Sequence, residues 1–389
     1  MPVPVRLHRP PAVRVSIAVL AFASAAVMSF GSRPAHAANV SCGDTITTDT
    51  KLHQDLVNCP KVGILVGADN VTLDLNGHTI DGDGASDSGC DPNTDFCDIG
   101  VAFEGRRGVT VKNGSVRDFE AGVVTFKARD ARLLRVSTQR NHLSGFALAS
   151  SDRILVRNSS GDRTTDPEGN GLGIFFCSHI RVLHSSFRGN VHAGIKPVGS
   201  TNGLIKGNVL ARNGDEGMLV EDGDRFRVKH NRFVRDGGGI TLGPGSGNVI
   251  KRNRVSRVGD GIRIEKGHDN LVARNVVVHA RHAGIRLGIR HPLLGGANNV
   301  VRRNVVRGSR IDGYLVGKRE RHSLLIGNVA TGAGDDGFDI ESRLTTLTGN
   351  RALRNGDLGI LAVRGVNDGG GKVARHDGDP RECTNIACN

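Results

Sequence analysis

Basic, acidic and imidazole side chains stand at fixed distances from regularly spaced glycines in this chain. The residues two positions after these glycines are Lys196, Leu219, Thr241, Arg263, Arg286, Leu315 and Asp339. One or two positions before the glycines are His192, Asp215, Glu216, Asp260, His282, Asp312, Asp335 and Asp336. If the units stack, these side chains form a row, which we call the Gly edge. A cation, a base and an acid in one row could cleave or epimerise a polyuronate.

Each side chain in the row has an expected role in such chemistry. Arg263 and Arg286 would bind substrate carboxylates, because a guanidinium fork matches that geometry and stays charged. Lys196 or His282 would take the proton, and Asp339 would orient the base. The residues assigned to substrate binding are His192, Asp260, Asp336 and Glu341, and Asp260 and Asp336 are also the candidate ligands for Ca²⁺. A purely structural role competes, since Asp-Gly is a common corner dipeptide and outward arginines solubilise surfaces.

The glycines that define the row recur about every 22 residues, which is the mark of a repeat protein. The series comprises Gly100, Gly122, Gly145, Gly173, Gly194, Gly217, Gly239, Gly261, Gly284, Gly313, Gly337 and Gly359. Between them lie only short alternating runs such as Ile262-Arg263-Ile264, too short for helices. Short strands of this kind bury their apolar side by coiling and stacking at the strand spacing of about 4.8 Å. We therefore predict a β-solenoid of about twelve rungs, a rung being one full coil.

A second series, of asparagines, falls at one phase of the same repeat. It comprises Asn208, Asn231, Asn253, Asn275, Asn304, Asn328 and Asn350. Asparagine tolerates the left-handed backbone of a corner, and stacked amides can hydrogen-bond from rung to rung. We expect these residues to stack at one corner of the solenoid.

The repeat Gly-Ile-x-Ile, followed by basic-Asn-x-Val, resembles the right-handed parallel β-helix repeats of the pectate-lyase-like superfamily. The resemblance spans roughly residues 60–389. It implies a right-handed parallel β-helix whose relatives include pectate lyases, polygalacturonases, alginate lyases and epimerases, and also binders without catalysis.

Two family motifs are matched only in part by residues 335–341. Gly337-Phe338-Asp339 resembles the Tyr-Gly-Phe-Asp-Pro-His-Asp signature of alginate C5-epimerases, but Asp336 replaces its Tyr and Glu341 its His. The Asp335-Asp336 pair resembles that of polygalacturonases, whose Gly-His-Gly and Arg-Ile-Lys motifs do not follow. A polysaccharide lyase is therefore the favoured enzyme class, ahead of an epimerase or a glycoside hydrolase.

Basic residues gather beside the asparagine series. They are Lys206, Lys229, His230, Lys251, Arg252, Arg274, Arg302 and Arg303, with Arg212, Arg235 and Arg257 four positions after an asparagine. A basic stripe that repeats with the rungs suits an acidic polysaccharide or a cell-wall polyanion, and a merely solubilising face is the alternative. Nucleic acid is not an expected partner, because export separates the chain from it and aromatic residues for base stacking are few.

The first 37 residues have the features of a secretory signal. Three arginines precede an apolar run over residues 15–30, and Ala35-His36-Ala37 gives a small-x-small cleavage site. Removing the segment's four arginines lowers the formal net charge from +13 to +9. We thus expect a secreted, basic protein. Its predicted organisation is a signal peptide (1–37), an N-terminal cap with the first coil and an Asp-rich loop (38–98), β-helix repeats (99–366) and a C-terminal cap (367–389).

Seven cysteines in an exported chain predict disulfides. Proximity in sequence favours the pairs Cys42–Cys59, Cys90–Cys97 and Cys383–Cys388, although six cysteines allow 15 connectivities. The outer pairs would close caps at the two ends of the solenoid. Cys177, in an apolar run, is expected to be a buried and inert thiol.

Six aspartates between Asp81 and Asp98 mark a loop that could hold Ca²⁺, but neither calcium-binding pattern is complete there, and a solvated loop is favoured. The sequence leaves two functions open. One is an exported enzyme, lyase-like, that acts on an acidic polysaccharide. The other is a non-catalytic β-helix protein that binds a polymer or wall surface or assists periplasmic maturation.

Overall fold

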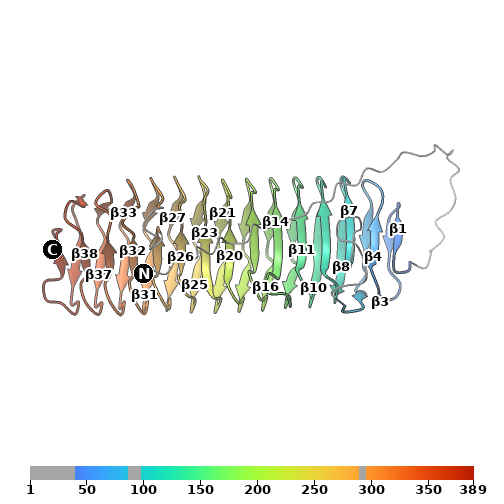
Figure 1. Cartoon of the computed structure of the whole chain (residues 1–389), viewed down its shortest axis with the longest axis horizontal. Coiled ribbons are helices and arrows are strands. Elements are labelled where there is room, and N and C mark those ends of the chain that lie inside the picture. The colour runs from blue at the N-terminus through green and yellow to red at the C-terminus, as the bar shows by residue number, and fades with distance from the viewer. Residues whose placement is uncertain (1–39, 86–97, 289–294) are drawn as a thin grey trace, which may run out of the picture.

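The chain folds into a right-handed parallel β-helix, a long stack of coils closed by small caps (Figure 1). The computed structural model describes residues 40–85, 98–288 and 295–389. Within these residues the regular elements are all strands, so none forms a helix that could cross a membrane. The predicted signal peptide and the Cys90–Cys97 pair lie outside the described residues.

One face of the helix is a 15-stranded parallel sheet, called sheet A, with one strand per rung. In order its strands are β1 (Asp44–Ile46), β4 (Val62–Val66), β7 (Ile99–Glu104), β9 (Ala121–Phe126), β11 (Ser144–Ala149), β14 (Asn170–Phe175), β17 (Ile195–Val198), β20 (Glu216–Val220), β23 (Gly238–Leu242), β26 (Ile262–Ile264), β29 (Ile285–Leu287), β32 (Tyr314–Val316), β35 (Phe338–Ile340), β38 (Ile360–Ala362) and β41 (Cys383–Thr384).

The other strands form two further stacks, which two long strands, β8 (Thr110–Arg117) and β10 (Arg132–Gln139), join by running through both. The first stack also contains β2 (Thr50–Lys51), β5 (Thr72–Asp74), β12 (Leu155–Arg157), β15 (Arg181–Leu183), β18 (Leu204–Lys206), β21 (Arg227–Lys229), β24 (Val249–Lys251), β27 (Leu271–Ala273), β30 (Val300–Arg302), β33 (Leu324–Ile326), β36 (Thr346–Thr348) and β39 (Asn367–Asp368). The second stack also contains β3 (Leu56–Cys59), β6 (Thr79–Gly82), β13 (Ser160–Asp162), β16 (Ser186–Arg188), β19 (Val209–Ala211), β22 (Arg232–Val234), β25 (Arg254–Ser256), β28 (Val276–Val278), β31 (Val305–Arg307), β34 (Val329–Thr331), β37 (Arg351–Leu353) and β40 (Val373–Arg375).

The core is a single apolar column inside the helix. In β26, Ile262 and Ile264 are buried and Arg263 points outward, as the alternation of a strand requires. Ile262 pairs with Ile240 on one side and with Ile285 on the other, so like side chains stack along the axis.

The glycine series locates the strands of sheet A from β7 to β38 but misses β1, β4 and β41 at the ends. The sheet therefore has more strands than the predicted twelve or so rungs. Gly63 in β4 aligns with Gly100, but the long segment between them interrupts the period, so the series does not reach β4 and β1. One glycine of the predicted series is the wrong one. Gly145 lies beside Gly171, and Gly171 lies beside Gly194, so Gly171, and not Gly173, occupies the repeated position.

The repeating glycines allow the backbones of neighbouring rungs to approach closely. They do not form the left-handed corners that the Asp-Gly dipeptides suggest. None of the twelve phase positions, with Gly171 in place of Gly173, has a positive φ. A Cβ at Gly261 would lie 2.3 Å from the carbonyl oxygen of Gly284 and 2.5 Å from a methyl of Val277. The missing side chain therefore lets successive coils stack.

The asparagines stack at one corner as predicted. Each amide donates to the Oδ1 of the next asparagine: Asn231 to Asn253 at 3.1 Å and Asn253 to Asn275 at 3.1 Å. Each Nδ2 also donates to a strand carbonyl, that of Asn253 to Val228 at 2.9 Å. The left-handed residue of the corner precedes the asparagine, as Arg252 does with φ 55°. Asparagine is thus selected for its amide and not for its backbone.

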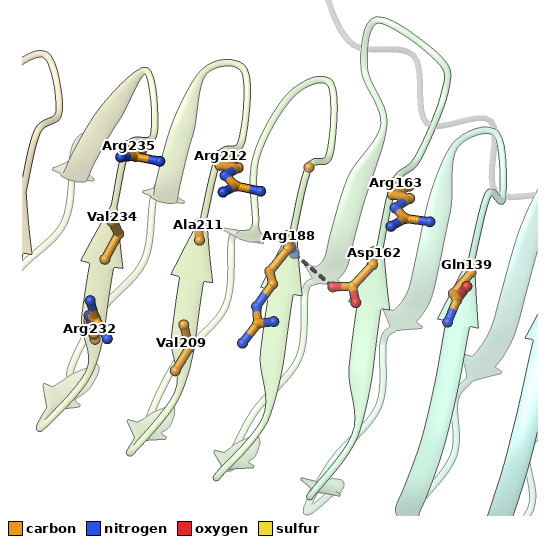
Figure 2. Close-up of a pocket in the computed structure, with 11 residues that line it drawn as sticks. Gln139, Asp162, Arg163, Arg188, Val209, Ala211, Arg212, Arg232, Val234 and Arg235 are labelled. Atoms are coloured by element: carbon orange, nitrogen blue, oxygen red, sulfur yellow. Dashed lines mark hydrogen bonds between the residues drawn. The ribbon is translucent and has the colours of Figure 1, made fainter.

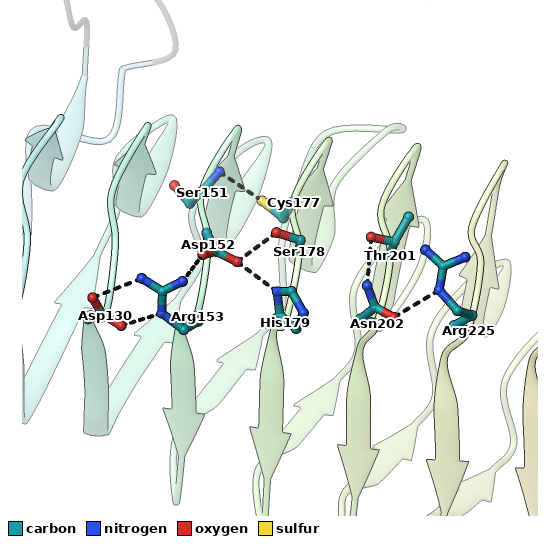
Figure 3. Close-up of polar contacts among 10 residues, drawn as sticks. All are labelled: Asp130, Ser151, Asp152, Arg153, Cys177, Ser178, His179, Thr201, Asn202 and Arg225. Atoms are coloured by element: carbon teal, nitrogen blue, oxygen red, sulfur yellow. Dashed lines mark hydrogen bonds and ion pairs between the residues drawn. The ribbon is translucent and has the colours of Figure 1, made fainter.

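Two of the predicted disulfides, Cys42–Cys59 and Cys383–Cys388, are confirmed near the ends of the helix. Cys177 is a buried free thiol that donates to the carbonyl of Leu148 at 3.3 Å. Its sulfur also accepts a hydrogen bond from the backbone amide of Ser151 at 3.4 Å (Figure 3). At the same corner Asp152 accepts from Ser178 at 2.6 Å and contacts His179 at 2.9 Å. Burial raises the pKa of Cys177 to about 11, which fits an inert thiol.

Candidate functional site

The outward side chains of sheet A form the row that the sequence predicts. Thr241 pairs with Arg263, Arg263 with Arg286, Arg286 with Leu315, and Leu315 with Asp339. Toward the N-terminus the same row continues through Leu219 to Lys196. The charged residues on this face form three separate clusters.

The central cluster surrounds Arg263. Its Nη2 donates to Oε1 of Glu216 at 2.9 Å, and its Nε lies 3.2 Å from Oε1 of Glu265. Arg286 lies 3.4 Å from Oδ2 of Asp260. Thr241 donates to Glu216 at 3.3 Å, so the hydroxyl and the guanidinium share one carboxylate oxygen.

These charges are unusually sheltered for an outward face. The side chains of Glu216 and Asp260 are 9% and 7% exposed, and those of Arg263 and Arg286 are 28% and 17% exposed. Burial raises the pKa of Glu216, the charge of Asp215 raises it further, and Arg263 opposes the shift. Sheltered ion pairs are costly to assemble and contribute little net stability, which makes this cluster a candidate for function.

The N-terminal cluster surrounds Lys196, whose Nζ lies 3.7 Å from Glu221 and 4.0 Å from Glu168. His192 contacts Asn170 through Nδ1 at 2.9 Å and Asp215 through Nε2 at 3.4 Å. Burial lowers the pKa of His192, and the charge of Lys196 lowers it further. A neutral imidazole is thereby favoured beside the ammonium.

The C-terminal cluster is acidic. Carboxylate oxygens of Asp335, Asp336 and Asp357 all lie within 4.8 Å of one another. Burial raises the pKa of Asp336 to about 7, although the amide of Leu358 donates to it at 2.9 Å. Three oxygen ligands at this spacing are of the kind that Ca²⁺ prefers.

The clusters separate residues that the sequence assigns to one centre. Lys196 is three rungs from Arg263, about 14 Å at the spacing of neighbouring strands, and its ammonium pairs with Glu221 and Glu168 instead of the carboxylates of the central cluster. Asp260 and Asp336 are also three rungs apart, and one ion cannot bind both. His282 lies exposed beside the central cluster, and Glu341 follows the far end of β35, away from Asp336.

Among the carboxylates that pair with these basic residues, only Asp260 receives a role from the sequence, whereas the four glutamates do not. Glu216 directly precedes Gly217 of the glycine series and belongs to the predicted row, so the sequence predicts its position but not its partner. Glu221 and Glu265 follow the ends of β20 and β26 by one residue, a weaker signal. Glu168 comes from the inserted segment after β13, and only the folded chain brings it to Lys196.

The basic stripe of the sequence is divided between two corners. Lys206, Lys229 and Lys251 stack at the ends of β18, β21 and β24. Arg212 and Arg235 lie beyond the next strands, β19 and β22, at the following corner. A three-residue strand separates the two, so they form separate surfaces.

Comparisons with known proteins agree with this fold. The family model described as "Right handed beta helix region" matches residues 170–328. No curated protein matches the sequence. The chain is a right-handed parallel β-helix protein.

Solved structures resemble it at low sequence identity. The A-module of a mannuronan C-5 epimerase of Azotobacter vinelandii has 13% identity and a TM-score of 0.60, over 79% of this chain and 91% of that chain. An exopolygalacturonase of Thermotoga maritima has 12% identity and a TM-score of 0.50, over 73% and 80%. A surface adhesin of Streptococcus pneumoniae has 13% identity and a TM-score of 0.50, over 76% and 81%. At such identities the likeness concerns the fold.

Proposed function

We propose that this protein is exported and binds an acidic polysaccharide along the outward face of sheet A, where it cleaves the polymer in a lyase-like reaction. The observation that carries the proposal is the pair of neighbouring arginines, Arg263 and Arg286, held by the sheltered carboxylates of Glu216 and Asp260. Export is supported by the two disulfides and by the signal-like segment.

The central cluster has the parts that β-elimination needs. A uronate carboxylate would replace Glu216 at Arg263, and the guanidinium would neutralise it. Glu216, whose pKa is raised, would then take the proton alpha to that carboxylate. The bond to the leaving oxygen breaks as the double bond forms, and water supplies a proton to that oxygen. Glu216 thus takes the role first assigned to Lys196 or His282.

The outer clusters would contact neighbouring sugars of the same chain. A polymer laid along the axis crosses one rung about every 4.8 Å. His192 and Lys196 would lie toward one end of it, and Asp336 and Asp339 toward the other. Asp335, Asp336 and Asp357 would hold Ca²⁺ if it binds, and the ion would supply positive charge for a sugar carboxylate.

A non-catalytic role in binding a polymer or wall surface is the second candidate. It is favoured by one observation: Lys196, Arg263 and Arg286 each have a carboxylate partner in the described structure. Such pairs can orient a surface that recognises a sugar without chemistry.

The experiment is to incubate the purified protein with polygalacturonate, alginate and hyaluronate, with and without Ca²⁺. A lyase yields an unsaturated product that absorbs in the ultraviolet. Glu216→Gln and Arg263→Ala should abolish this product, whereas Arg227→Ala, an exposed arginine on another face, should not. Retention of a polymer without product would select the non-catalytic role, and neither retention nor product would exclude both.

A further inference from the structure

A basic groove lies around the corner from sheet A, on the second stack of strands (Figure 2). It has a volume of about 450 Å³ and spans β10, β13, β16, β19 and β22. Its lining residues are Gln139, Asp162, Arg163, Arg188, Gly189, Val209, Ala211, Arg212, Arg232, Val234 and Arg235. Five of the eleven are arginines, and all five are exposed.

Small side chains form the floor of the groove and arginines its rim. Val209, Ala211 and Val234 point outward from β19 and β22, and Arg212 and Arg235 stand at the ends of these strands (Figure 2). Gly189 occupies the same corner position one rung before Arg212, and its lack of a side chain leaves room beside Arg163. The groove therefore forms because the residues between the arginines have small side chains or, at Gly189, none.

The guanidinium groups of the groove have no ion pair or side-chain hydrogen bond within residues 40–85, 98–288 and 295–389. Other arginines in the same region do: Arg140, at the same corner position, donates to Asp118 at 2.8 Å. On sheet A, Arg263 and Arg286 are likewise paired. The groove thus gathers five arginines around one carboxylate, that of Asp162. Burial raises the pKa of this carboxyl, and the charges of Arg188 and Arg163 oppose the shift. This excess of positive charge favours an anionic ligand.

The corner itself does not require arginine. Arg163, Arg212 and Arg235 have φ of 59°, 60° and 61°, a left-handed conformation that glycine adopts more readily. Gly189, with φ 65°, makes the same corner without a side chain. Arginine at these positions is explained by its guanidinium and not by the backbone.

We propose that this groove binds a segment of anionic polysaccharide, with its carboxylate or sulfate groups on Arg163, Arg212 and Arg235. From Arg163 to Arg235 is three rungs, about 14 Å, so a ligand that contacts all three must extend along the axis. The lining contains no aromatic side chain on which nucleic-acid bases could stack. The site goes beyond the function proposed for sheet A and does not depend on it.

Asp162, at the end of β13, lies beside Gln139 of β10, which closes that end of the groove. Asp162 accepts a hydrogen bond from the backbone amide of Arg188 at 2.8 Å. Its carboxylate would repel an anionic group and can accept hydrogen bonds from sugar hydroxyls instead. The groove therefore favours a ligand that carries both hydroxyls and anions over a simple inorganic anion.

The test is to measure binding of fluorescent polygalacturonate and dextran sulfate, with neutral dextran as the uncharged control. The variant is Arg212→Asn with Arg235→Asn, because asparagine tolerates the left-handed corner. The matched control is Arg354→Asn, an exposed arginine with φ 57° at the same corner position far from the groove. We expect the double variant to lose affinity by about tenfold, since two exposed charge contacts are removed. The control should bind as wild type, and added salt should weaken wild-type binding more steeply than that of the double variant.

Three results would overturn the proposal. They are unchanged affinity in the double variant, an equal loss in Arg354→Asn, and tighter binding of single-stranded DNA than of the glycans at the same salt. Arg263→Ala separates the two sites. Adding Arg212→Asn and Arg235→Asn to it should lower affinity about tenfold relative to Arg263→Ala alone, because the groove is then the site being measured. Arg263→Ala by itself should abolish product only if the sheet A proposal holds.

Discussion

Arg263 donates to Glu216 across two rungs at 2.9 Å, passing over the rung that carries Thr241. The guanidinium is long enough to reach past its neighbour, and Glu216 is too sheltered to be solvated by water. The two charges are therefore mutually dependent, because removal of either leaves the other partly buried without its partner.

This dependence predicts a stability loss that varies with pH. Arg263→Ala should lower the free energy of unfolding by about 1–3 kcal/mol at pH 8. The loss should be smaller at pH 5, because burial raises the pKa of Glu216 and the lower pH favours the neutral form that needs no partner. Urea denaturation at both pH values checks this. Glu216→Gln combined with Arg263→Ala should recover part of the loss at pH 8. An equal loss at both pH values would contradict the dependence.

The asparagine ladder should contribute more to stability than any exposed corner residue. Asn253→Ala removes the acceptor for the backbone amide and the Nδ2 of Asn231, and leaves both donors buried. We expect a loss of about 2–4 kcal/mol. Asn298→Ala, at an exposed corner, is the control and should cost about 1 kcal/mol or less. Thermal unfolding of both variants decides this prediction.

Asp236 should make the protein less stable as the pH rises from about 4 to 7. It is fully buried next to Asn213, with one oxygen lacking a partner in the described structure, and burial raises its pKa to about 7. The folded state binds this proton more tightly than the unfolded state, so stability falls through that window.

Asp236→Asn isolates this effect, because its amide can continue the ladder of Asn190 and Asn213. The variant should gain at most about 4 kcal/mol over wild type at pH 8 and little at pH 4. Denaturation of both proteins across this range gives the measurement. A constant difference over the whole range would show that Asp236 does not titrate there.

Thiol labelling should report one cysteine and only after unfolding. Cys177 is buried and its pKa is raised to about 11, so iodoacetamide should not modify the native protein at neutral pH. In denaturant without reductant, mass spectrometry should find one carbamidomethyl group. Three groups would mean that Cys90 and Cys97 are not joined.

Much of the fold could be predicted from the sequence because a solenoid converts sequence phase into spatial position. Each rung contacts only its neighbours, so one period of about 22 residues predicted the stacked strands, the Asn231–Asn253–Asn275 ladder and the outward row from Lys196 to Asp339. The end disulfides followed from cysteine proximity. The number of rungs did not follow, because the long segment between Gly63 and Gly100 hides the coils of β1 and β4 from a search for one period.

The pairing of charges was decided only by the tertiary structure. The position in the repeat places Arg263 beside Thr241. The length of the arginine side chain and the burial of Glu216 decide that Arg263 reaches Glu216 two rungs away. The glycines looked like corner residues, yet the clash of a Cβ with the next coil explains them, and that clash exists only once coils are stacked. The arginine groove depends on small side chains at Val209 and Ala211 and on the gap at Gly189. A period identifies columns of residues, but contacts across rungs and the space left between side chains depend on atomic packing.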